Sequence, residues 1–138
     1  MNNGDLFQKV KELKLPIGKY ALFGSAPLGI RGLKECRDAD IVVTADSWNE
    51  YKEKGWEEKT SVGGSCCLRK GEIELWKDWG PGRWEIEKLI EEAEIIDGLP
   101  FVRLATVIAW KKQYGREKDL EDIEMIEKFL ETRELKAK

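Results

Sequence analysis

The sequence contains no histidine, only three cysteines and four prolines, and no long run of apolar residues. The absence of histidine excludes catalytic triads, general bases and zinc hydrolase sites that depend on an imidazole. The cysteines, Cys36, Cys66 and Cys67, lack the spacing of a metal site, so we interpret them as reduced thiols. Without an apolar stretch of signal or membrane length, we expect a cytoplasmic protein that has no membrane partner.

Charge of either sign is plentiful, but neither sign dominates. The 138 residues include 24 Lys+Arg and 27 Asp+Glu, for a formal net charge of −3, and 41% of the chain is hydrophobic. A weakly acidic chain argues against an extended groove for binding DNA, because such a groove needs a basic protein surface. A chain of this length can form one hydrophobic core. We expect a single domain over 1–138, with a sheet-containing core over 1–102 and a C-terminal helical hairpin over 103–138.

The first part of the chain alternates between helix and strand patterns. Apolar residues at helical spacing predict a helix over 5–15, with Asp5 as its N-cap. Apolar runs predict strands over 19–23 and 38–44, and the connector 26–34 between them has room for one short helical turn. The second strand is apolar on both faces, which predicts a central position in the sheet.

The remaining elements follow from capping, turn and periodicity signals. Ser47 to Glu50 has the form of a capping box, which predicts a helix that ends at Gly55. The later elements are predicted, in chain order, as a strand over 56–61, a turn at Gly63-Gly64, a hairpin over 66–76, a loop over 78–82, a helix over 84–93, a short strand over 94–97 ended by Gly98-Leu99-Pro100, and two helices, 104–114 and 117–132, on either side of Gly115.

The stretch that could carry chemistry joins the first two strands. Gly24-Ser25 ends the first strand, and twelve residues separate Ser25 from Asp38 and its neighbour Asp40 in the second. Residues i and i+2 of a strand point to one face, so we expect two carboxylates side by side. They repel each other unless a cation lies between them, and hard divalent cations such as Mg²⁺ take oxygen ligands. Taken alone, Asp-x-Asp is more typical of solvated acids at a turn or strand edge; the Gly-Ser before it and the β-branched run after it favour a functional pair.

The whole pattern, apolar-Gly-Ser followed after a dozen residues by Asp-apolar-Asp-apolar, resembles the DNA polymerase beta-like nucleotidyltransferase superfamily and its small, minimal members. The resemblance spans nearly the whole chain. It implies an α+β nucleotidyltransferase fold, with a short mixed β-sheet flanked by helices. It also implies metal-dependent transfer of a nucleoside monophosphate from an NTP to an acceptor hydroxyl. Asp38 and Asp40 would hold two Mg²⁺ ions, for which Mn²⁺ is an alternative, and Gly24 with Ser25 would cradle phosphates.

The resemblance implies a third carboxylate on a neighbouring strand, between apolar residues. Ile73-Glu74-Leu75 fits this description. An unpaired Glu in a strand buried on both sides is costly, and metal or proton chemistry would explain it. Glu74 would then bind a metal or take the acceptor's proton. The alternative is a hairpin edge on which Glu74 faces water.

Cations gather around the turn between the last two helices. The stretch resembles a Lys…Gly-Arg-x-Lys-Asp-x-x-Asp signature of several small nucleotidyltransferases. Its cations could contact a triphosphate, and the acids Asp119 and Asp122 could orient them or cap the last helix. The alternative is the ordinary charge pattern of two helix ends. The candidate nucleotide-binding cations are Arg37, beside the acid pair, and Lys111, Lys112, Arg116 and Lys118.

Three functional hypotheses follow. The first is an enzyme that uses an NTP to modify a small molecule, an RNA end or a protein. The second is a catalytically weak nucleotide-binding or antitoxin-like module, because small members of the family often pair with a helical HEPN toxin. The third is a structural domain with incidental acids. The tryptophans Trp76, Trp79 and Trp84 are interpreted as core and rim residues, with stacking on a base as the alternative.

Overall fold

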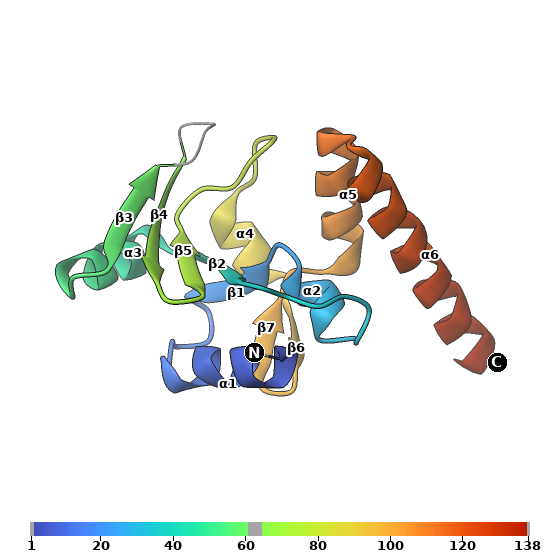
Figure 1. The fold of residues 1–138 in the computed structure, drawn as a ribbon, viewed down its shortest axis with the longest axis horizontal. Coiled ribbons are helices and arrows are strands. Elements are labelled where there is room, and N and C mark those ends of the chain that lie inside the picture. Colours follow the sequence, from blue (N-terminus) through green and yellow to red (C-terminus); the bar gives the residue numbers. More distant parts are fainter. Residues whose placement is uncertain (1, 61–64, 138) are drawn as a thin grey trace.

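The computed structural model describes residues 2–60 and 65–137, with side chains up to Arg133. The described chain is α+β, with helices around a mixed seven-stranded sheet whose order is β3-β4-β5-β2-β1-β7-β6 (Figure 1). The elements are α1 (Asn3–Glu12), β1 (Tyr20–Phe23), α2 (Ala26–Gly29), β2 (Ala39–Val43), α3 (Ala45–Glu53), β3 (Glu57–Thr60), β4 (Cys66–Lys70), β5 (Ile73–Trp76), α4 (Ile86–Glu91), β6 (Glu94–Ile96), β7 (Leu99–Phe101), α5 (Leu104–Tyr114) and α6 (Glu117–Ala137). Among these helices, none is long and apolar enough to cross a membrane.

Strand β2 lies in the middle of the sheet, as its apolar sequence predicted. It pairs antiparallel with β1 and parallel with β5, and Ile41, Val42 and Val43 are completely buried. The parallel β1–β7 pair and the antiparallel β4–β5 hairpin make the sheet mixed. This arrangement confirms the expected mixed sheet flanked by helices.

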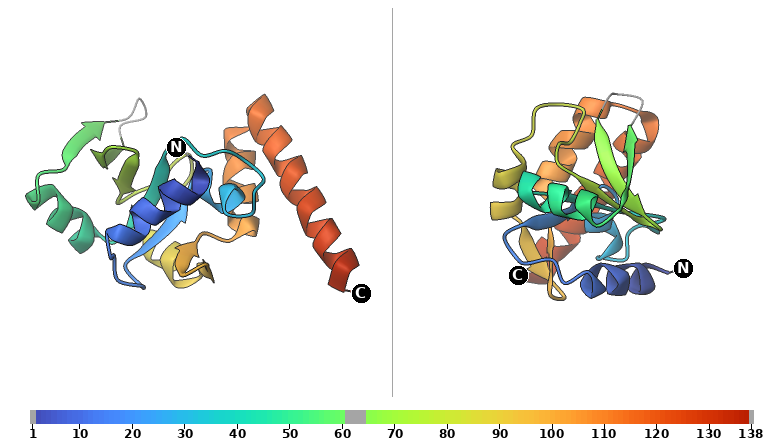
Figure 2. Two further views of the ribbon diagram at one scale, coloured as in Figure 1. Left: turned by 60° about the horizontal axis from the view of Figure 1, so that its bottom comes forward. Right: turned by 90° about the vertical axis from the view of Figure 1, so that its left-hand side faces the viewer.

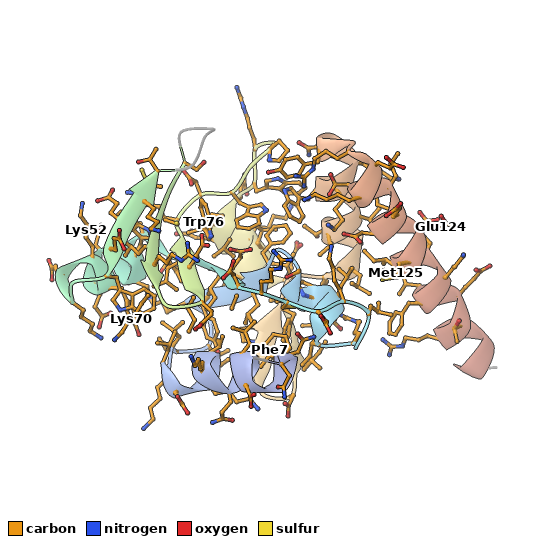
Figure 3. All side chains as sticks on the ribbon, in the orientation of Figure 1. Phe7, Lys52, Lys70, Trp76, Glu124 and Met125 are labelled. Carbon is orange, nitrogen blue, oxygen red and sulfur yellow. The ribbon has the colours of Figure 1, made fainter. Side chains whose placement is uncertain are left out.

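The two faces of the sheet contribute to two separate hydrophobic clusters, because side chains alternate along each strand. On one face, Ile41 and Leu75 pack with residues of α1 and α3. Phe7 of α1 points toward the sheet and makes an edge contact with Phe101, with ring centroids 5.6 Å apart (Figure 3). On the other face, Val42 packs with residues of α4, α5 and α6. The candidate acids lie on this second face.

Two predicted helix starts are wrong. Helix α1 begins at Asn3, and the side chain of Asn2, rather than Asp5, caps it by accepting a hydrogen bond from the Asp5 N–H at 2.8 Å. Helix α3 begins at Ala45 with Thr44 as N-cap, so Ser47 lies inside the helix and is buried. The chain turns into α3 directly after β2, which leaves no loop for the predicted capping box.

The predicted break at Gly98-Leu99-Pro100 is right in part: β6 ends at Ile96, but Leu99 and Pro100 belong to a further strand. Asp97 and Gly98, with φ of 51° and 80°, form a tight turn. Leu99–Phe101 then continues as β7, which pairs with β6 on one side and with Leu22 of β1 on the other. Asp-Gly between two apolar runs is a hairpin signal that the sequence analysis missed. The following helical hairpin is confirmed: Gly115, with φ of 64°, ends α5.

Other boundaries shift by a few residues. Helix α4 is shorter than the predicted 84–93, and α6 continues to Ala137 beyond the predicted end. Figure 2 shows α6 at the opposite end of the molecule from α3 and β3. The predicted Gly63-Gly64 turn lies outside the described residues.

The position of β7 predicts how the fold responds to core truncation. Phe101 is completely buried, whereas Ile95 on the adjoining edge strand β6 is 55% exposed. Phe101→Ala should lower the free energy of unfolding by about 3–5 kcal/mol, and Ile95→Ala should change it by less than about 0.5–1 kcal/mol. Urea unfolding of both variants measures the difference. If Phe101→Ala lowered the free energy of unfolding as little as Ile95→Ala does, then Leu99–Phe101 would not be part of the core.

Candidate functional site

The sheet brings the three predicted acids into one neighbourhood. Asp40 of β2 is the register partner of Glu74 on parallel strand β5 and of Phe23 on β1. Asp38 immediately precedes β2. Since β2 and β5 are adjacent and in register, Asp40 and Glu74 project from the same face. The Asp-x-Asp pair and Glu74, 34 residues further along the chain, therefore lie together only because β2 and β5 pair.

Each carboxylate is held by a different donor. The Trp76 Nε1–H donates to Asp40 Oδ1 at 3.3 Å, and the Cys67 thiol donates to Glu74 Oε2 at 3.3 Å. Arg69 Nη2 lies 3.7 Å from Asp38 Oδ1. Figure 3 labels Trp76, the last residue of β5. The acids are thus oriented by neighbouring side chains of β4 and β5.

The negative charge of the cluster is incompletely compensated. Burial, together with the charge of Glu74, raises the pKa of Asp40 to about 7, although the Trp76 hydrogen bond acts in the opposite direction. Burial and the contact with Glu74 raise the pKa of Cys67 to about 12, so this thiol stays protonated and can remain a donor. A cation beside Asp40 would relieve the same repulsion that raises its pKa.

Gly24 is required at its position by the packing of Asp40. Its φ is 60°, and a Cβ placed there would lie 2.5 Å from Asp40 Oδ2. Only glycine combines this backbone conformation with room for the carboxylate. Ser25 follows as the N-cap of α2, but its side chain makes no capping hydrogen bond, and it lines the cleft described next.

An open cleft of about 1550 Å³ borders the acid pair. It lies among the N-terminus of α1, the α2–β2 connector, the start of β2 and the start of α6. Both acidic and basic side chains line it, which suits a ligand that carries anionic groups together with a cation. Its charged lining residues are Lys34, Glu35, Arg37, Asp38, Asp40, Glu72 and Lys118, and Ser25 lines it as well.

The predicted C-terminal cations are dispersed in the structure. Lys111 is buried and forms ion pairs with Asp122 at 2.9 Å and Asp119 at 3.6 Å. Arg116 pairs with Asp119 at 2.6 Å and lies over the Tyr114 ring, with Cζ 3.8 Å from the centroid. These contacts support the interpretation that the two aspartates orient the cations.

Two other lysines of the hairpin are exposed, and they have different surroundings. Lys118, at the start of α6, lines the cleft, whereas Lys112 lies on the surface of α5 outside its lining. Sequence analysis missed Lys34, which also lines the cleft and whose Nζ lies 2.8 Å from Asp122 Oδ2. Because Lys34 lies in the connector between the predicted site residues Ser25 and Asp38, its position in the sequence could have identified it as a candidate site residue.

The acids are of the right chemical type to bind a hard divalent cation, but their side chains are not arranged around a common metal position. Among residues 2–60 and 65–133, no group of three His, Cys, Asp or Glu side chains is arranged to hold a metal ion. Asp38 and Asp40 nevertheless line the cleft, and Asp40 has a raised pKa. Glu74 lies beside Asp40 on β5 but is not one of the lining residues. Carboxylate oxygens are the preferred ligands of Mg²⁺. The side chains would have to turn from Trp76, Cys67 and Arg69 to share one ion.

An aromatic cluster adjoins the acids. Trp79 stacks on Phe23, with ring centroids 4.8 Å apart, and contacts Trp76 and Trp110 at 5.5 and 5.3 Å. The Trp79 Nε1 atom is buried and has no hydrogen-bond partner in the described structure. These contacts support the interpretation of Trp79 as a packing residue. Through its bond to Asp40, Trp76 connects this cluster with the acid pair.

The raised pKa of Asp40 predicts a pH-dependent stability. The folded state favours the neutral form of the Asp40 carboxyl group. The stability that this neutral form contributes is fully present below the unfolded pKa of about 3.8, and it is lost as the pH rises through the folded pKa of about 7. The loss amounts to at most about 4 kcal/mol, at 1.36 kcal/mol for each pKa unit. In EDTA, Asp40→Asn should therefore gain stability relative to the wild type between pH 5 and 8.5.

Urea unfolding across that pH range tests this prediction. The control is Asp78→Asn, which removes a carboxylate from the exposed loop after β5 and should follow the wild-type curve. If the wild type and Asp40→Asn show parallel stability profiles, then Asp40 does not titrate abnormally.

The contact between Gly24 and Asp40 yields a second prediction. Gly18 also has a positive φ, 95°, but nothing lies within 4 Å of a Cβ placed there. Gly18→Ala should cost about 1–2 kcal/mol from backbone strain alone, whereas Gly24→Ala should cost about 1–3 kcal/mol more because of crowding. Thermal unfolding compares the two variants, and equal losses would mean that Asp40 can move away freely.

Comparisons with protein-family models, with curated proteins and with solved structures found no match. The side chains around the cleft are therefore the basis for assigning a function.

Proposed function

We propose that this protein is a metal-dependent nucleotidyltransferase that moves a nucleoside monophosphate from an NTP to an acceptor hydroxyl. The observation that carries the proposal is the register of β2 with β5, which sets Asp40 beside Glu74 while Asp38 and Asp40 line the cleft. Carboxylates and cations that line the same cleft can hold the two parts of a metal–triphosphate complex. The proposal includes a fold like that of the small nucleotidyltransferases.

The roles of the residues follow from their positions. Asp38 and Asp40 would hold divalent cations, and Glu74, one strand away, would accept the proton of the acceptor hydroxyl. Ser25, at the N-terminus of α2, and the cations of the cleft would bind the phosphates. Mg²⁺, when bound, would neutralise phosphate charge and make the acceptor hydroxyl more acidic. The attacking oxygen forms a bond to the α-phosphorus, and pyrophosphate leaves.

A second candidate function has support of its own. Each acid is engaged by a protein donor, Trp76, Cys67 or Arg69. That arrangement would also suit a module that binds a nucleotide, or a helical partner protein, without turnover. Binding of MgATP without release of pyrophosphate would favour this second candidate over the enzyme.

Substitution of the acids separates the roles proposed for them. Asp38→Asn and Asp40→Asn each remove a charge from the metal ligands, so affinity for MgATP and turnover should fall together. Glu74→Gln should retain MgATP binding within about tenfold, or 1.4 kcal/mol, but lose about 100-fold or more in transfer, the usual scale for a general base. Asp78→Asn, outside the cleft, is the control and should match the wild type in both measurements.

The measurements are calorimetry with ATP, with and without EDTA, and pyrophosphate release from each of the four NTPs with Mg²⁺ and cell extract as the source of acceptor. ATP that binds equally well in EDTA would contradict the metal role of the Asp pair. Wild-type transfer by Glu74→Gln would exclude Glu74 as the base.

A further inference from the structure

We propose that Lys34, rather than the buried Lys111, binds the phosphates on this side of the helical hairpin, and that Asp122 and Lys111 position it. This inference rests on the proposed function, since the anion in question is the triphosphate of an NTP. It concerns the part of the cleft where the α2–β2 connector meets the helical hairpin.

Lys34 belongs to an ion-pair group with Lys111, Arg116, Asp119 and Asp122, and it is the member of that group that lines the cleft. Its side chain is 36% exposed and lines the cleft, whereas that of Lys111 is only 7% exposed. Both ammonium groups contact the same oxygen, Asp122 Oδ2, at 2.8 and 2.9 Å. An ammonium group has three N–H donors. The bond to Asp122 uses one donor of Lys34, which leaves two for an anion in the cleft.

Within the group formed by Lys34, Lys111, Arg116, Asp119 and Asp122, the cations outnumber the carboxylates. Lys34, Lys111 and Arg116 are three cations that share two carboxylates, Asp119 and Asp122. Burial alone would raise the pKa of Asp122, but hydrogen bonds from Lys34 and Lys111 outweigh it and lower this pKa below its usual range. Asp122 therefore stays ionised near neutral pH, and one positive charge remains uncompensated within the group.

The position of Lys34 is determined from two sides. The Asn3 side chain of α1 donates a hydrogen bond to the Lys34 carbonyl at 2.8 Å and accepts one from the Cys36 N–H at 2.8 Å. These bonds hold the backbone of the connector, while Asp122 of α6 holds the ammonium group. Lys111 holds Asp122 in turn, and as a buried cation it requires such a partner. The ammonium group is thus preorganised, which lowers the entropy lost on binding.

Binding of sodium tripolyphosphate and of MgATP, measured by calorimetry, tests the role of Lys34 itself. Lys34→Ala should weaken binding of both probes at least tenfold. The matched control is Lys19→Ala, because Lys19 is 46% exposed and pairs with Asp46 at 2.9 Å but does not line the cleft. The control should bind both probes as the wild type does. Lys34→Arg should recover part of the affinity, since it restores the charge.

The positioning role needs a variant that folds without the buried ion pair. Asp122→Asn alone leaves the buried Lys111 poorly paired and threatens folding. The double variant Lys111→Met with Asp122→Leu replaces both charges by apolar groups of similar size, which is often tolerated. It keeps Lys34 but removes its anchor, so tripolyphosphate affinity should fall several-fold, and adding Lys34→Ala should then have a smaller effect than in the wild type.

The outcomes distinguish the inference from the proposed function. If the wild type binds MgATP and Lys34→Ala binds it equally well, the role of Lys34 is overturned and the proposed function stands. If the double variant binds tripolyphosphate as tightly as the wild type, the positioning role is overturned. If the wild type binds neither probe, both the inference and the proposed function are overturned.

Discussion

The close approach of Gly24 to Asp40 is the constraint around which this site is built. A side chain at Gly24 would meet the Asp40 carboxylate at 2.5 Å, and the two residues adjoin because Phe23 and Asp40 are register partners. The contact brings the carboxylate against the backbone at the end of β1, where burial raises its pKa. It also directs the chain into α2, so that Ser25 faces the same cleft as Asp40.

The acidic and basic side chains around the cleft come from different elements of the fold. The sheet supplies acids from β2 and β5, and the connector and α6 supply cations. The helical hairpin contributes through Asp122, which pairs with Lys34 and Lys111 at once. A ligand with phosphates and a bound cation requires side chains of both signs.

Local patterns predicted most of the fold because they reflect local physics. The apolar run of β2, the hairpin from β4 to β5 and the glycine that ends α5 were all recognisable from the sequence. The errors occurred where two signals competed. Pro100 and Gly98 suggested a break, but Asp97-Gly98 forms a tight turn and Leu99 to Phe101 pairs with β1 as well as β6. Burial between neighbouring strands outweighed the low strand propensity of proline.

For the site, the sequence by itself determined the spacing of Asp38 and Asp40 and the glycine before them, because strand geometry and left-handed backbone conformations are local properties. Only the tertiary structure decided what surrounds them. The β2–β5 pairing selected Glu74 as the neighbour of Asp40, and the packing of α6 buried Lys111 and left Lys34 at the cleft. Strand order and helix docking depend on contacts between residues far apart in the chain, and no pattern of neighbouring residues encodes those contacts.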